Sequence, residues 1–127
     1  MDKFVFACGS GDITTVETLL PSVDPSARNN WAIQVASCYG HIEIVRLLLE
    51  DPRVDPSACS NYAIRWASEN GYLEVVRLLL TDSRVDPSAL ENMAIIWAKE
   101  TGHTEIVDLL TEHQFRLDGP EYTKNIL

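Results

Sequence analysis

Apolar residues recur three and four positions apart in short segments of this chain, and turns rich in Asp, Pro and Gly separate the segments. Residues 42–49 show the pattern at Ile42, Val45, Leu48 and Leu49. This spacing places the apolar side chains on one face of a helix. A helix of about eight residues is unstable alone in water. The sequence therefore predicts short amphipathic helices that are stable only when they bury one another's apolar faces.

The pattern repeats with a fixed period. The pentapeptide Val-Asp-Pro-Ser-Ala begins at Val23, Val54 and Val85, positions that are 31 residues apart. A constant period in this range is typical of a stacked repeat array. We therefore expect one domain over residues 1–127, with an N-terminal capping unit, three full repeats and a C-terminal tail: 1–22, 23–53, 54–84, 85–115 and 116–127.

Each full unit is expected to contain a turn and two helices. In the first full unit the helices are predicted at residues 31–38 and 42–49, and in the N-terminal unit at residues 2–8 and 12–20. Pro fixes the turn backbone, and the Asp and Ser side chains bond to it. An Asn precedes each first helix, and Asn is a favoured N-cap residue. We predict that these residues cap the first helices: Asn30, Asn61 and Asn92.

The last unit departs from the pattern. Thr111 stands where the earlier units have Leu49 and Leu80, and Asp108 replaces an arginine. Polar substitutions of this kind are typical of a terminal unit, which has one face without a neighbour. The stack is therefore expected to end here and to remain a monomer. A turn at Gly119-Pro120 and a frayed or loosely docked tail are expected to follow.

The second-helix segment carries a resemblance to a known family. Gly-His-Ile-Glu-Ile-Val-Arg-Leu-Leu-Leu at residues 40–49 recurs at 71–80 and 102–110, and weakly at 11–20. This segment resembles the ankyrin repeat. The resemblance implies an all-α solenoid of stacked helix-turn-helix units. Because the unit is shorter than the family's usual length of about 33 residues, the projecting turns should be short. The Asp-Pro-Ser-Ala variant looks similar to ankyrin arrays of giant viruses of amoebae and of microbial eukaryotes.

The first helix departs from the family pattern. Trp31-Ala-Ile-Gln34 and its counterparts replace the usual Thr-Pro-Leu-His. Trp31 and its counterparts Tyr62 and Met93 either pack between units or form an exposed stripe, and both readings stay open. Trp66 and Trp97 occupy positions where the family has a core leucine, and they are expected in the core.

The resemblance also implies a binding surface. In ankyrin-like arrays, the turns and first helices line a concave face on which partners bind. Positions there that differ from unit to unit can serve a partner without disturbing the stack. The candidate residues are Arg28, Asn29, Trp31, Gln34, Tyr39, Cys59, Tyr62, Arg65, Glu69, Asn70, Leu90, Glu91, Met93, Ile96 and Glu100.

We therefore expect a non-enzymatic protein–protein interaction module that acts as an adaptor, a scaffold or an inhibitor. Arg65 and Tyr62 lie in the middle unit, and Arg and aromatic residues often dominate binding energy. A variant that replaces both is expected to keep the fold and lose the partner.

Composition narrows the possible partners. The net charge is −9 and the isoelectric point is near 4.6, so the surface repels nucleic acid. The charge serves solubility or attracts a basic protein surface. Three cysteines without a Cys-x-x-Cys spacing indicate neither a disulfide scaffold nor a thiolate zinc site, and favour an intracellular, cytoplasmic protein. The apolar patch at residues 4–8 is too short for a secretory signal or a membrane span.

Few residues in the sequence suggest a catalytic or metal-binding site. Cys38 and His41 stand three positions apart and could support a metal-binding or hydrolytic protein, which is the alternative function. However, His41 falls in the Gly-His turn of the repeat, as His103 does, and no third group supports the pair. Phosphate-binding glycine loops are also missing from the sequence. We therefore expect no catalytic residue, no metal and no cofactor.

Overall fold

The structure is a computed structural model that describes residues 2–118. Within this range every regular element is a helix, which confirms the all-α repeat solenoid. The turn predicted at Gly119-Pro120 and the rest of the predicted tail beyond it lie outside the described residues. The elements are α1 (Lys3–Ser10), α2 (Ile13–Leu19), the 3-10 helix η1 (Leu20–Ser22), α3 (Ala27–Cys38), α4 (Ile42–Leu49), α5 (Ala58–Asn70), α6 (Leu73–Leu79), α7 (Ala89–Glu100) and α8 (Thr104–Asp118).

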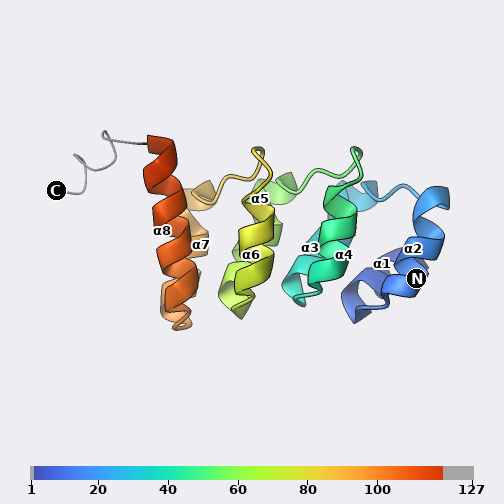
Figure 1. Ribbon diagram of the computed structural model, residues 1–127, viewed down its shortest axis with the longest axis horizontal. Coiled ribbons are helices and arrows are strands. Elements are labelled where there is room, and N and C mark those ends of the chain that lie inside the picture. The colour runs from blue at the N-terminus through green and yellow to red at the C-terminus, as the bar shows by residue number, and fades with distance from the viewer. Residues whose placement is uncertain (1, 119–127) are drawn as a thin grey trace.

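The helices stack as antiparallel pairs that form two rows (Figure 1). The first helices α1, α3, α5 and α7 pack side by side in one row. The second helices α2, α4, α6 and α8 form the other row, which lies in front of the first in Figure 1. The connections that lead into α3, α5 and α7 project along one edge of the stack.

The core lies between the two rows. Ile33 and Ile64 from the first helices are fully buried, as are Val45, Leu48 and Leu79 from the second helices. Full burial of such a side chain contributes roughly 1.5–3 kcal/mol. In the predicted stripe of residues 42–49, Val45 and Leu48 therefore face the core, whereas Ile42 and Leu49 are half-buried beside it.

The N-terminal helices have side-chain caps. Asp2 Oδ1 accepts a hydrogen bond from the Val5 backbone N–H (3.1 Å), and Asp12 Oδ1 accepts one from the Thr15 N–H (3.2 Å). Each aspartate satisfies one of the amides that a helix leaves unpaired at its N-terminus.

The predicted asparagine caps are wrong. Asn30, Asn61 and Asn92 each end a run of three residues with left-handed backbone angles, and α3, α5 and α7 have no side-chain cap bond. A left-handed residue turns its side chain away from the amides of its own helix. Asn tolerates this conformation better than most residues, and this explains why Asn recurs at the position.

The asparagines instead connect one unit to the next. Asn30 Oδ1 accepts a hydrogen bond from the Asp55 backbone N–H (2.7 Å), and Asn61 Oδ1 accepts one from the Asp86 N–H (2.8 Å). Both carboxamides are buried. Within one unit, Arg84 ties the end of residues 54–84 back to its start, because its Nη2 donates to the Val54 carbonyl (2.9 Å).

Gly11, Gly40 and Gly71, each of which precedes a second helix, make room for a side chain of the next unit. Gly40 has a φ of 76°, and a Cβ atom there would lie 2.5 Å from the ring of Tyr72. Only glycine combines this backbone conformation with so close a contact. The Gly-His turn is structural as well, because His41 Nε2 lies 2.9 Å from the Gly9 carbonyl oxygen.

Candidate interaction face

The first-helix row, which we call the first-helix face, carries most of the large apolar side chains that are well exposed in the described residues. Six large apolar side chains are well exposed among the described residues, and five of them come from this row or its ends: Phe6, Trp31, Tyr39, Leu90 and Ile96. The sixth, Tyr72, packs its ring against Gly40. Grouped exposed apolar side chains are typical of interaction sites.

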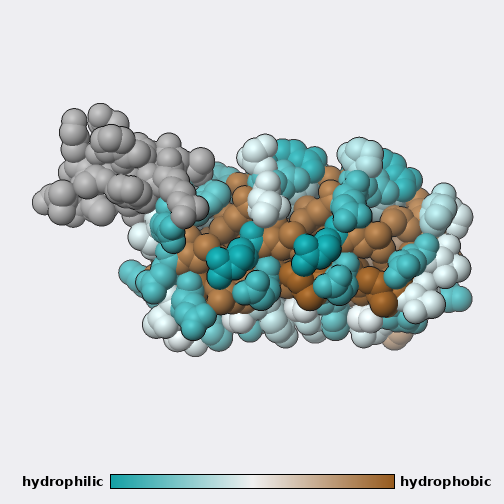
Figure 2. Space-filling model, in the orientation of Figure 1, coloured by the Kyte–Doolittle hydropathy of each residue, from teal (hydrophilic) through white to brown (hydrophobic). Residues whose placement is uncertain are grey.

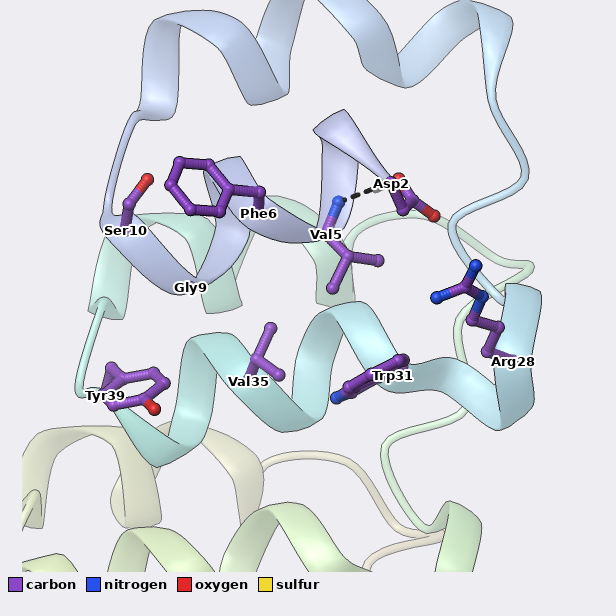
Figure 3. Close-up of a pocket in the computed structure, with 9 residues that line it drawn as sticks. All are labelled: Asp2, Val5, Phe6, Gly9, Ser10, Arg28, Trp31, Val35 and Tyr39. Atoms are coloured by element: carbon purple, nitrogen blue, oxygen red, sulfur yellow. Dashed lines mark hydrogen bonds between the residues drawn. The ribbon is translucent and has the colours of Figure 1, made fainter.

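An open pocket of about 370 Å³ lies between α1 and α3 (Figure 3). The exposed fractions of Phe6 and Tyr39 on its rim are 60% and 59%. Trp31 lies at one end of the pocket, with the Arg28 guanidinium 5.6 Å from its ring centroid. The pocket thus offers aromatic walls and a single cation near one end. Its lining residues are Asp2, Val5, Phe6, Gly9, Ser10, Arg28, Trp31, Val35 and Tyr39.

Sequence reasoning missed the α1 side of this pocket. Val5 and Phe6 lie in the partial first unit, which was interpreted only as a cap. A signal was present on α3, where Trp31, Val35 and Tyr39 are spaced four residues apart and therefore share one helix face. The matching wall on α1 follows only from the packing of the two helices.

The expectation that Trp66 and Trp97 are core residues is wrong. Both are only half-buried, and they meet edge to face across α5 and α7 with ring centroids 6.3 Å apart. Tyr62 joins them, 5.4 Å from Trp66. Because this position lies on the first-helix face, its large rings cover neighbouring first helices and remain in part accessible to solvent.

Arg65 and Gln34 do not belong to the accessible face. Arg65 is 8% exposed, and its guanidinium lies between the rings of Tyr62 and Trp97, 5.3 Å and 5.7 Å from their centroids. Its Nε donates to the Ser60 carbonyl and its Nη2 to the Cys59 carbonyl, each at 3.0 Å. In the preceding unit, Gln34 Nε2 donates to the Asn29 carbonyl at 2.8 Å. Both side chains stabilise the left-handed turn of their own unit.

This placement changes the expected effect of the Arg65 and Tyr62 variant. Removing Arg65 would leave two backbone carbonyls without their donor and would uncover two aromatic rings. The variant therefore tests stability as well as binding, and the expectation that it leaves the fold intact is not supported by these contacts.

The other candidate residues are either exposed or half-buried in the structure. Trp31 is exposed, whereas Tyr62 and Met93 are half-buried. At this position of the repeat, the side chain is therefore exposed in the first full unit and partly packed between units in the other two. Glu69 is also half-buried. The remaining candidates are exposed: Arg28, Asn29, Tyr39, Cys59, Asn70, Leu90, Glu91, Ile96 and Glu100.

The second-helix side shows a different surface (Figure 2). Hydrophobic residues form a band there, which hydrophilic residues cross and border. Glu43 with Arg46, and Glu74 with Arg77, form exposed ion pairs at 3.8 Å and 3.7 Å. Exposed pairs at this spacing contribute little to stability. They are therefore suitable positions for control substitutions.

The geometry gives the Cys38 and His41 alternative little support. Burial raises the pKa of Cys38, and the His41 ring is occupied with the Gly9 carbonyl. Burial also raises the pKa of Cys8 to about 12, which disfavours its thiolate. Among the residues that the structure describes, no group of three or more His, Cys, Asp or Glu side chains could hold a metal ion.

A search for membrane spans in the described part of the chain found no helix with the required length and apolar character.

The fold and the first-helix face define a helical repeat protein with one continuous surface across its units. The sequence matches a family model described as ankyrin repeats (3 copies) over residues 4–91 and 64–127. The chain therefore belongs to the ankyrin repeat family, as its second-helix motif indicated. A search of curated proteins gave no significant match.

A similar solved structure is a chain in the crystal structure of the yeast ribosomal protein Rps3 in complex with its chaperone Yar1. The TM-score is 0.73 and the sequence identity is 26%, over 87% of this chain and 90% of that chain.

Proposed function

We propose that this protein is a non-enzymatic interaction module that binds a protein partner on its first-helix face. The observation that carries the proposal is the concentration there of exposed large apolar side chains, five of the six in the described residues. Membership of the ankyrin repeat family supports a role in protein interaction. The similar structure of a ribosomal protein with its chaperone supports a protein as the kind of partner.

The pocket between α1 and α3 offers the best anchoring point on this face. Trp31 and Tyr39 are both exposed, and aromatic residues of this kind often contribute about 2 kcal/mol or more when they are central in an interface. The pocket volume of about 370 Å³ is large enough for an apolar side chain of the partner. The pocket and the Tyr62, Trp66 and Trp97 rings then bind neighbouring parts of one partner.

Charge favours a partner with a basic surface. Glu69, Glu91 and Glu100 lie along the first helices, and the whole chain carries a net charge of −9. A field of one sign steers an oppositely charged partner toward the face and raises its association rate. The apolar anchors then supply most of the affinity.

Affinity capture from the source cell, with matched variants, tests this proposal. A Trp31→Ala and Tyr39→Ala double variant removes two exposed rings, so it should keep its melting temperature and lose the partner. The control is Glu74→Ala with Arg77→Ala on the second-helix side, which should bind as the original chain does. Loss of the partner by the control but not by the aromatic variant would place the binding surface on the second helices.

A further inference from the structure

The third full unit exposes a hydrogen-bond acceptor that the earlier units use internally. Asn30 and Asn61 each accept a backbone N–H from the turn of the following unit, and both are buried. Asn92 occupies the same position in the third unit but is exposed. Its backbone N–H donates to the Ser88 carbonyl (2.9 Å), but its side chain has no hydrogen-bond partner within the described part of the chain. Its carboxamide oxygen is therefore available to an external N–H donor.

Two backbone carbonyls next to Asn92 also differ from those of the earlier units, in the side-chain donors that reach them. Arg65 donates to the carbonyls of Cys59 and Ser60, and Gln34 donates to the equivalent Asn29 carbonyl. The third unit has Ile96 at this position, which is 41% exposed and has no polar group. The carbonyls of Leu90 and Glu91 therefore lack the side-chain donor that their counterparts have.

The surroundings of these acceptors favour a cation with planar donors. Glu91 and Glu100 are exposed on α7, and Leu90 and Ile96 add exposed apolar surface. Arg65 shows that a guanidinium fits this local geometry, because its fork of N–H donors spans the two equivalent carbonyls. An ammonium group has no such fork and is a poorer match.

We propose that the open side of α7 binds an arginine-bearing segment of a partner protein. The guanidinium donates to the Leu90 and Glu91 carbonyls, and a backbone N–H of the same segment donates to Asn92 Oδ1. The inference rests on the proposed function and specifies the partner chemistry at one end of the first-helix face. The segment takes the place that Arg65 and the Asp86 turn occupy around the middle unit.

A peptide titration of the full chain tests the inference. The probe is the blocked peptide Ac-Ala-Arg-Ala-Arg-Ala-NH2, followed by two-dimensional NMR of the backbone amides. We expect the largest shifts at residues 89–97. The lysine peptide, with equal charge, should bind at least tenfold more weakly because it lacks the fork. Equal affinity for the two peptides would show that binding depends on charge alone and not on the guanidinium group. That result would overturn the inference.

Substitutions at Ile96, with a control at Thr111, provide a second test of the inference. Ile96→Arg places a guanidinium where Arg65 has one, so it should weaken arginine-peptide binding at least tenfold. Thr111→Arg adds the same charge on exposed α8 and should bind the peptide almost normally. Ile96→Gln, which copies Gln34, serves the same purpose if Ile96→Arg does not fold. Unchanged peptide binding by the folded Ile96 variant would overturn the inference.

Other outcomes separate this inference from the proposed function. Shifts centred on Trp31 and Tyr39 would keep the first-helix face as the binding surface and reject the α7 site. Light scattering at the titration concentration checks for self-association. A dimer of the free chain that Ile96→Arg dissociates would show that a second copy, and not a partner's arginine, occupies the site.

Discussion

At the scale of single residues, the most sensitive positions are the buried polar side chains that satisfy backbone groups. The Asn61 carboxamide satisfies the Asp86 backbone N–H, and the Arg65 guanidinium satisfies two carbonyls. Removing one partner of a buried hydrogen bond leaves the other unsatisfied, which costs more than the bond itself contributes.

The first prediction concerns this asparagine link. Asn61→Ala should lower the free energy of unfolding by about 1–3 kcal/mol, because the Asp86 amide loses its acceptor. Urea denaturation measures the change. Asn92→Ala is the matched control, because the Asn92 side chain is exposed and makes no hydrogen bond within the described residues. Both asparagines have a left-handed φ, of 60° and 66°, so the two variants share the same backbone strain. Asn92→Ala should therefore lose clearly less than Asn61→Ala, and equal losses would contradict the link.

The second prediction concerns the turn glycines, and it separates the stability lost through backbone strain from the stability lost through a steric clash. Gly40 and Gly102 have similar φ angles of 76° and 80°, but only Gly40 has a ring against it. Gly102→Ala should lose about 1–2 kcal/mol from left-handed strain alone. Gly40→Ala should lose clearly more, because Tyr72 must move. Thermal or urea denaturation of the two variants measures the difference. Equal losses of stability would show that the contact with the Tyr72 ring is unimportant.

At the scale of elements, the turn between units is stabilised by its own side chains. Asp55 Oδ1 accepts hydrogen bonds from the Ser57 backbone N–H (2.9 Å) and hydroxyl (2.6 Å). Asp82 forms a bidentate pair with Arg84. These bonds lower the pKa of both aspartates, through Ser57 for Asp55 and through Arg84 for Asp82. Protonation of Asp55 or Asp82 therefore weakens the turn that its side chain stabilises.

The third prediction follows from these pKa shifts. A carboxyl group whose pKa is lowered in the folded state contributes stability above its unfolded pKa of about 3.9. That contribution is lost as the pH falls through the folded value. Asp82→Asn removes one such group, so its destabilisation relative to the original chain should be large at pH 7 and shrink below pH 4. Urea midpoints across this range measure it, and a constant difference would contradict the assignment.

At the scale of the whole molecule, stability and assembly depend on how the stack ends. An internal helix pair packs against a neighbouring pair on each side along the stack. The last helix pair has a neighbour on one side, and its α8 places Asp108 and Thr111 in exposed positions. Polar end units limit the growth of a repeat stack. The open side of α7 differs from these polar positions, because Leu90 and Ile96 are exposed there.

The fourth prediction is that the free chain is a monomer. Its net charge of −9 and its polar end positions both oppose self-association. Light scattering at micromolar concentration should give a mass near 14.2 kDa. A dimer at that concentration would count against the prediction and would direct attention to α7 as the contact.

The sequence by itself determined the elements that depend on local rules. The apolar spacing of Val45 and Leu48 predicted a second helix with one buried face, and the 31-residue period predicted the stack. These signals are reliable because helix periodicity and turn chemistry act over a few neighbouring residues. Exposed positions such as Trp31 and Tyr39 were identified as candidates because they differ between units.

Only the tertiary structure decided the roles of side chains that cross between units. Asn30 bonds to the next turn and not to its own helix, because the left-handed backbone redirects its side chain. Arg65 is buried because the Trp97 ring of the next unit covers it, and Trp66 is only half-buried because it lies on the outer side of its helix row. Such contacts join residues about one repeat apart. The local sequence does not predict these contacts, because the geometry of stacking determines which side chains meet.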